Sequence, residues 1–324
     1  MTITQASPIG TPLVSVIIPT YRRPGLLRLA VDSVLAQTYP NLEVIVVHDG
    51  PDPETAEAMR GIDPRVRYHE LAVNSGPGAA RNAGIDLARG EWIGFLDDDD
   101  RWLPHKLQTQ IAALVPGERN IILASRCIYE HGDRRDIWPA RPIGENEDLA
   151  DYLLCRNGIF ERPGVLPIHS LLVPRHLLTE VPLVTAADHE DWSWMLHVWH
   201  RAGARFRFIW EPLVTYTVAV DSISRSRRMN WLDSIAWANL NRAWIGNAAY
   251  ASFLATKVAL KAKRKRDWRG LLHITRLVWA TDPSLLNLTF LAGMFLLPSS
   301  LLNAAWRKSL KSKDQVGTSR VQPQ

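Results

Sequence analysis

The stretch Trp92-Ile-Gly-Phe-Leu-Asp-Asp-Asp-Asp100 joins a five-residue apolar run directly to four adjacent carboxylates. A short, continuous apolar run is typical of a strand that is buried on both faces. Neighbouring carboxylates repel one another, so the quartet needs solvent or a cation to compensate its charge. A solvated acidic loop and a divalent-metal site both account for it. Its place at the end of a buried strand favours the metal site, and oxygen ligands favour Mg²⁺ or Mn²⁺.

The residues before this stretch alternate apolar runs with helical patterns. Strands are expected at residues 14–18, ending at Pro19, and at 42–47 and 66–69, with helices at 24–37, 53–60 and 79–89. This alternation predicts an α/β fold with a mainly parallel, Rossmann-like sheet that is flanked by helices. Ligands of such sheets bind beyond the carboxyl ends of the strands.

The pattern loosens after the acidic run and changes again near residue 226. Strands are expected at residues 121–129, 169–173 and 206–209 and a helix at 192–201, followed by a helical, basic, tryptophan-containing segment. We therefore expect a flexible N-terminus (1–11), an α/β domain (12–225), a helical basic extension (226–310) and a disordered tail (311–324). The apolar segment 285–297 is shorter than the ~20 residues that a membrane-spanning helix needs.

Charge is divided unevenly along the chain, although 46% hydrophobic residues leave enough for a folded core. Residues 222–324 hold 17 basic and four acidic residues, whereas residues 1–221 are net acidic. A basic extension favours peripheral contact with an anionic membrane, and no nucleic-acid-binding module is recognisable. Two cysteines and the absence of a signal-peptide pattern predict a cytoplasmic protein, on the inner face of the membrane if the extension binds lipid.

Three further motifs follow expected strands or open expected helices. Asp49, before Gly50, either turns the chain or accepts hydrogen bonds from a nucleobase or ribose. Arg81 follows a glycine-containing turn and either pairs with a carboxylate or binds a diphosphate. Glu190 and Asp191 begin a helix, where they serve as capping residues or as a general base.

Taken together, these motifs resemble the family 2 glycosyltransferases of the nucleotide-diphospho-sugar transferase (GT-A) superfamily. The matching stretches are Val14-Ser-Val-Ile-Ile-Pro-Thr-Tyr21, Glu43-Val-Ile-Val-Val-His-Asp-Gly50, Gly78-Ala-Ala-Arg-Asn-Ala-Gly84, Gly94-Phe-Leu-Asp-Asp-Asp-Asp-Arg-Trp-Leu-Pro104 and Glu190-Asp-Trp192. Their order and spacing fit the family across residues 12–225. The chain departs from the family pattern at His48 and Pro51, and at Asp221, where relatives often have a histidine.

The resemblance implies a role for each matching position. Pro19, Thr20 and Tyr21 fall where the family contacts the nucleoside, Asp49 where it binds the base, and Arg81 near the diphosphate. Asp97 and Asp99 match the DxD pattern, with Asp99 as the first choice of metal ligand and Asp97 and Asp98 nearer the ribose. Asp191 matches the catalytic base, with Glu190 beside it. Trp192 and His169 are expected near the acceptor.

The resemblance also implies a reaction. The family moves a sugar from a nucleotide-diphosphate donor, here expected to be a UDP-sugar, to a hydroxyl of a glycan or lipid-linked acceptor, with inversion and with Mn²⁺ or Mg²⁺. Such an enzyme would be a hexosyltransferase of cell-surface polysaccharide synthesis. A nucleotidyltransferase of related fold and a catalytically silent protein that binds sugar nucleotides are the alternatives.

Overall fold

The computed structural model describes residues 10–132, 134–159, 161, 163–185, 189–217 and 230–298. The expected disordered tail (311–324), most of the expected flexible N-terminus, and Asp221 lie outside the described residues.

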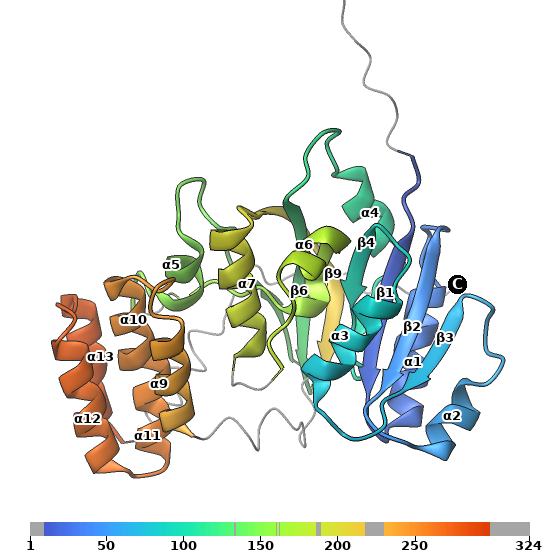
Figure 1. The fold of residues 1–324 in the computed structure, drawn as a ribbon. Coiled ribbons are helices and arrows are strands. Elements are labelled where there is room, and N and C mark those ends of the chain that lie inside the picture. The colour runs from blue at the N-terminus through green and yellow to red at the C-terminus, as the bar shows by residue number, and fades with distance from the viewer. Residues whose placement is uncertain are drawn as a thin grey trace, which may run out of the picture.

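One mixed sheet of nine strands organises the molecule (Figure 1). Four parallel strands form one half of it, in the order β3 (Val66–Glu70), β2 (Leu42–His48), β1 (Val14–Thr20) and β4 (Trp92–Phe95). The other half holds β8 (Leu171–Pro174), β6 (Ile121–His131), β9 (Arg205–Thr217) and β5 (Arg101–Trp102), with β7 (Arg134–Trp138) paired to β6. This α/β fold confirms the predicted fold class.

Helices cover both faces of the sheet, because alternate residues of its strands enter two separate cores. Ile17 of β1 and Ile45 of β2 pack into one core, and their neighbours Val16 and Val44 into the other. The first helices along the chain are α1 (Pro24–Leu35), α2 (Pro53–Met59), α3 (Pro77–Leu87) and α4 (Lys106–Ala112). Those that follow are α5 (Leu149–Leu154), the 3₁₀ turn η1 (Ile168–Ser170), α6 (Arg175–Glu180) and α7 (Glu190–Arg201).

The C-terminal helices pack on the sheet domain through α5 and α7. They are α9 (Trp231–Leu240), α10 (Asn247–Phe253), the π-helical segment η2 (Leu254–Val258), α11 (Ala259–Arg264), α12 (Trp268–Trp279) and α13 (Leu285–Leu296). One core runs from the sheet through Trp194 of α7 to Trp237 and Leu271 of these helices. Figure 1 shows α12 and α13 at the end of the molecule farthest from β3.

Several expected strand limits are wrong: the strand expected at residues 169–173 begins only at Leu171, after the turn η1, and two other limits involve prolines. Pro19 does not end β1, because β4 pairs with β1 only as far as Ile17, and beyond it β1 pairs with β2 alone. The strand expected at residues 206–209 continues to Thr217. Pro212 is accommodated there by an irregularity between β6 and β9, where the pairing shifts register after Ser125.

Candidate active site

The acidic run follows β4 at the carboxyl ends of the parallel strands, and its four carboxylates meet three different cations. Asp97 lies 2.7 Å from Arg81. Arg23 lies 2.6 Å from Asp98 and 3.2 Å from Asp99. Asp100 lies 3.0 Å from the Nδ1 atom of His169. The quartet is therefore compensated within the protein, rather than forming a solvated loop.

Burial raises the pKa of Asp98 and Asp99, the two middle carboxylates of this run. Asp98 is almost fully buried, and burial raises its pKa to about 7, although Arg23 and a 2.7 Å hydrogen bond from the hydroxyl of Thr20 favour the ionised form. Burial also raises the pKa of Asp99, and the charge of Asp97 adds to that effect. A cation bound among these carboxylates would favour their ionised forms.

Arg81 of α3 joins the acidic run to the start of α7. Its guanidinium donates hydrogen bonds to Asp97 at 2.7 Å and to Glu190 at 2.8 Å, and it lies 3.7 Å from Asp191. Although burial opposes its charge, these three carboxylates raise the pKa of Arg81 above its usual range. The structure thus gathers three of the side chains that the sequence singled out around a fourth, the buried cation Arg81.

Close approach of α3 to α7 depends on a glycine. A Cβ atom at Gly78 would lie 2.9 Å from Oε2 of Glu190 and 3.2 Å from the backbone of Thr185. A larger residue would require the side chain of Glu190 and the backbone at residues 184–185 to shift. Gly78 therefore allows Arg81, one turn further along α3, to reach Glu190.

The structure also places a histidine in the acidic cluster. Asp97, Asp100 and His169 each offer a ligand atom, and these atoms lie within 4.8 Å of one another. Despite burial, Asp100 raises the pKa of His169 well above its usual value. The Nε2 atom of His169 is buried and makes no hydrogen bond within the described part of the chain. Two carboxylates and one imidazole are a donor set that fits Mn²⁺.

The sequence-based prediction did not name Asp100 as a ligand and did not name Arg23 at all. Asp100 could have been considered, since it belongs to the same acidic run, and Arg23 follows the first strand. His169 was expected near the acceptor. It reaches Asp100 through η1, from a distant part of the chain, so no local sequence pattern relates the two residues.

Asp49 organises a loop at the end of β2. Its two carboxylate oxygens accept hydrogen bonds from the backbone N–H groups of Ser75, at 2.6 Å, and Gly76, at 2.8 Å. These bonds order the turn that precedes α3. Each oxygen has a second lone pair, which a nucleobase or ribose could still use.

His48 connects the ends of β1 and β2. Its buried ring accepts a 3.0 Å hydrogen bond at Nε2 from the backbone N–H of Arg22 and contacts the carbonyl of Gly50 through Nδ1. The ring of Tyr21 lies 5.9 Å from that of His48. The residue that departs from the family pattern therefore supports the loop that carries Tyr21.

Trp192 contacts the C-terminal helices. Its ring stacks on His189 with a centroid distance of 4.7 Å, and the ammonium of Lys257 lies 4.0 Å from its centroid. Trp237 is 5.8 Å away. His189 has a left-handed backbone (φ 61°), which residues other than glycine rarely adopt. Trp192 thus lies at the junction of the sheet domain and the extension, directly after Asp191.

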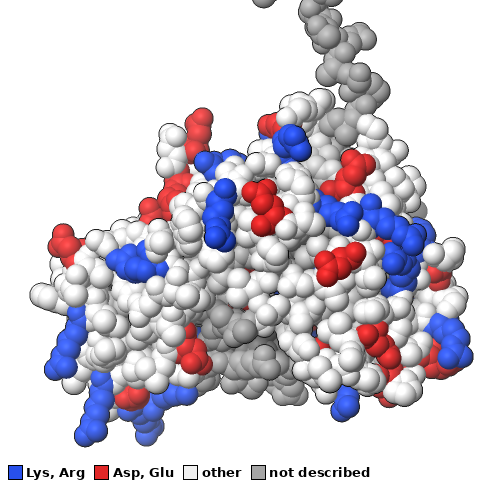
Figure 2. Space-filling view, in the orientation of Figure 1, with Lys and Arg blue, Asp and Glu red and all other residues white. Residues whose placement is uncertain are grey.

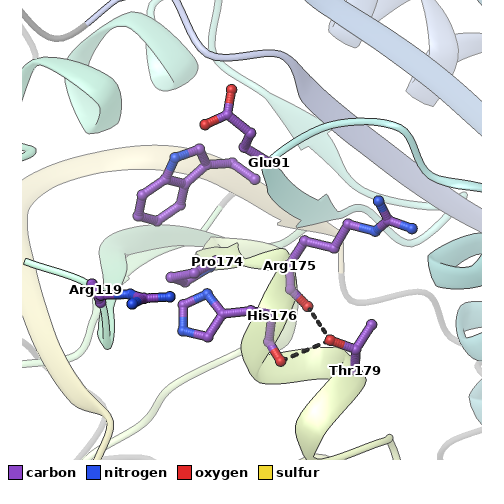
Figure 3. Close-up of a pocket in the computed structure, with 7 residues that line it drawn as sticks. Glu91, Arg119, Pro174, Arg175, His176 and Thr179 are labelled. Carbon is purple, nitrogen blue, oxygen red and sulfur yellow. Dashed lines mark hydrogen bonds between the residues drawn. The ribbon is translucent and has the colours of Figure 1, made fainter.

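A cavity of about 530 Å³ lies at the opposite edge of the sheet from the acidic run, by the first residue of β4 (Figure 3). Its lining comprises Glu91, Trp92, Arg119, Pro174, Arg175, His176 and Thr179. The close-up shows the guanidinium of Arg119 pointing toward the ring of His176. None of the side chains that the sequence singled out lines this cavity, so the ion-pair geometry, and not the cavity, defines the candidate site.

A family comparison agrees with this geometry. Residues 15–167, which include all of β1 but Val14, as well as Arg81 and the acidic run, match the family model described as "Glycosyl transferase family 2". The matched part of the chain therefore belongs to the family 2 glycosyltransferases. The matched range ends just before His169, and Asp191 lies beyond it.

Several curated glycosyltransferases are similar in sequence to this chain. The amylovoran biosynthesis glycosyltransferase AmsB of Erwinia amylovora is 27% identical over 263 residues, or 77% of this chain and 84% of its own length. An uncharacterized glycosyltransferase of Rickettsia felis is 41% identical, over 59% of this chain and 32% of its own. The putative colanic acid biosynthesis glycosyl transferase WcaA of Escherichia coli is 40% identical, over 49% of this chain and 50% of its own. The chain thus spans less than two thirds of the last two relatives.

Solved structures share the GT-A fold of this chain. The mannosyltransferase PcManGT of Pyrobaculum calidifontis, in complex with GDP-Man and Mn²⁺, superposes with a TM-score of 0.58 over 92% of this chain and 84% of its own, at 18% identity. S. aureus TarS 1-349, in complex with UDP-GlcNAc, gives 0.56 over 92% and 88%, at 17% identity. These likenesses establish the fold.

Proposed function

We propose that the chain is an inverting glycosyltransferase that moves a sugar from a nucleoside-diphosphate donor to a hydroxyl of a glycan or lipid-linked acceptor. The observation that carries this proposal is the position of Arg81 between Asp97, at the end of β4, and the Glu190–Asp191 pair of α7. Direct displacement needs a leaving-group site and a proton acceptor on either side of one sugar. Arg81 contacts a candidate for each: Asp97, beside the proposed leaving-group site, and Asp191, the proposed proton acceptor.

We propose that the donor lies along the carboxyl ends of β1, β2 and β4. Pro19, Thr20 and Tyr21 would contact the nucleoside, and Asp49 the base. Arg81 would bind the diphosphate through Nε, which is buried and makes no hydrogen bond to any described residue. Uridine is the proposed base, since TarS 1-349 was solved with UDP-GlcNAc.

We propose that a divalent cation, Mn²⁺ or Mg²⁺, assists departure of the nucleoside diphosphate. Asp97 is common to both candidate ligand sets, which continue either with Asp99 or with Asp100 and His169. When bound, the ion would stabilise the negative charge that develops on the leaving phosphate. Comparing Asp99→Asn with Asp100→Asn separates the two sets, because only loss of a ligand should raise the Mn²⁺ concentration needed for half-maximal turnover.

Asp191 is the proposed general base. Burial raises its pKa, and one of its carboxylate oxygens makes no hydrogen bond among the described residues, so it can accept a proton from an acceptor hydroxyl. Glu190 is the neighbour that binds Arg81. Trp192 and His169 are the proposed acceptor-side residues, with Trp192 forming a wall of the site.

We propose that the acceptor belongs to cell-surface polysaccharide synthesis and that the donor sugar is a hexose. AmsB and WcaA are named for amylovoran and colanic acid biosynthesis, which supports this class of product. The charge of the extension supports peripheral contact with an anionic membrane, on its cytoplasmic side.

The experiment that tests the proposed reaction identifies its products. Nucleotide sugars are screened by thermal shift with and without Mn²⁺, since a specific ligand stabilises the folded state. The best donor is then incubated with acceptor extracts. Release of nucleoside diphosphate with a glycosylated acceptor supports the proposal. Release of pyrophosphate would identify a nucleotidyltransferase, and donor binding without turnover a silent binding protein.

A further inference from the structure

The C-terminal helices expose an unusual amount of apolar surface. Nine of the fifteen large hydrophobic side chains exposed in the described part of the chain belong to residues 231–297. On α12 they are Trp268, Leu272 and Trp279, which recur at intervals of four and seven residues and so share one side of the helix. Trp279 is 65% exposed.

The helix α13 continues this surface. Leu285, at 81% exposure, and Leu296 are eleven residues apart and lie on one side of the helix. The ring of Phe295 stacks on Trp268 of α12 with a centroid distance of 6.4 Å. The two helices therefore present a joined surface, here called the α12–α13 face and defined by Trp268, Leu272, Trp279, Leu285 and Leu296.

Basic side chains border the α12–α13 face. Arg264, Lys265, Arg266, Arg269 and Arg276 are all exposed on α11, α12 or the turn between them. Residues 257–298 hold eight basic and two acidic residues. One of the acidic residues, Asp267, is bound to Trp231 and to the backbone of Gly270. In Figure 2, blue side chains project from the lower left of the molecule, where Figure 1 places α11 and α12.

We propose that the α12–α13 face docks on an anionic lipid bilayer, with both helices lying in the plane of the interface. This inference deepens the proposed function, on which it rests, by naming the surface that contacts the membrane. Tryptophan is favoured at the level of the headgroups, leucine just below it, and arginine beside lipid phosphates. Among the described helices, none is long and apolar enough to cross a membrane.

Charge distinguishes a bilayer from two other occupants of the face. A symmetric contact with a second copy would bring the same cations together, at an electrostatic cost. Residues 299–324 of this chain hold five basic residues and one acidic residue, so they have the same sign of charge as the face. Anionic lipid headgroups have the opposite sign.

The test is co-sedimentation of the full chain with vesicles of phosphatidylcholine alone or mixed with phosphatidylglycerol. We expect binding to the mixed vesicles that weakens as salt is added. The double variant Arg269→Gln/Arg276→Gln should weaken it about 25-fold, since each cation contributes about fivefold. Trp279→Ser should weaken binding to both vesicle types. The matched controls are Arg60→Gln and Val73→Ser, because Arg60 is also exposed to solvent and Val73 is 66% exposed, both far from these helices in the sequence.

Three outcomes would overturn the inference. The first is wild-type vesicle binding by both the charge and the tryptophan variants. The second is equal binding to neutral and anionic vesicles. The third is a dimer in sedimentation velocity that Trp279→Ser converts to a monomer. None of these depends on turnover, so a failed membrane test with intact transfer to a water-soluble acceptor leaves the proposed function standing.

Discussion

The acidic edge of the sheet and the α12–α13 face handle charge in opposite ways. At the sheet edge, carboxylates meet cations inside the protein, and Arg81 alone contacts Asp97, Glu190 and Asp191. At the α12–α13 face, cations and tryptophans point outward. Buried ions must be paired because desolvation is costly, whereas exposed cations cost little and remain available to a partner. We therefore propose chemistry on a bound substrate for the first region and contact with a membrane for the second.

The largest effect is expected from removing Arg81, the buried cation at the sheet edge. Arg81→Met would leave three carboxylates without their shared partner, and we expect it to lower the free energy of unfolding by about 3–5 kcal/mol. Urea denaturation measures this loss. Arg67→Met is the control, because Arg67 is partly exposed, pairs with Glu43 at 3.2 Å, and should cost about 1 kcal/mol or less. Equal losses in both variants would contradict the assigned importance of Arg81.

A buried lysine extends the comparison between buried and exposed cations. Lys106 is fully buried, donates a 2.5 Å hydrogen bond to Gln110 and lies 4.0 Å from the ring centroid of Trp102. Burial lowers its pKa from 10.5 to about 7. Below about pH 7 the Lys106 amine is protonated in both the folded and the unfolded chain, and burying the ammonium lowers the free energy of unfolding by its full cost. Between about pH 7 and 10.5 only the unfolded chain keeps the proton, so stability should rise with pH.

Lys106→Met should remove this rise, which we expect to amount to about 2–4 kcal/mol across the window. Urea denaturation at a series of pH values measures it. Lys265→Met removes an exposed ammonium and should leave the slope of the wild type unchanged. A rise that persists undiminished in Lys106→Met would show that other groups cause it.

The smallest expected effect concerns the loop that carries Tyr21. His48→Ala would leave the backbone N–H of Arg22 without its acceptor, at a cost of about 1 kcal/mol. If the loop contacts the donor, the KM for the donor should rise about fivefold while kcat changes little. His69→Ala, at an exposed position of β3, is the control. An unchanged donor KM would show that this loop does not contribute to donor binding.

The first half of the fold could be predicted from the sequence because its strands and helices alternate with clear periods. The same rules failed at Pro19 and Pro212, where strands continue because the sheet pairs differently around each proline. Residues 92–100 gave both the strand β4 and the acidic run. The helices α4, α5 and α6 were not predicted, since they are short and owe their stability to packing against the sheet.

The candidate site could be predicted only where motifs follow strands or begin helices. Asp97, Arg81 and Asp191 were singled out individually, and the structure shows what joins them, which is one guanidinium. The approach of His169 to Asp100 could not be predicted, because it depends on how the second half of the sheet folds back beside β4. Long-range contacts of this kind leave no periodic pattern in a single sequence.

The measurement that tests the central claim most directly compares donor affinity and turnover in Asp191→Asn. The substitution keeps the size of the side chain and removes its ability to accept a proton. We predict that kcat falls about 10²–10⁴-fold, while the Kd of the donor, measured by calorimetry, changes less than about threefold. Wild-type turnover in Asp191→Asn, or a loss of donor binding as large as the loss of turnover, would contradict the claim that Asp191 is the base of a sugar transfer.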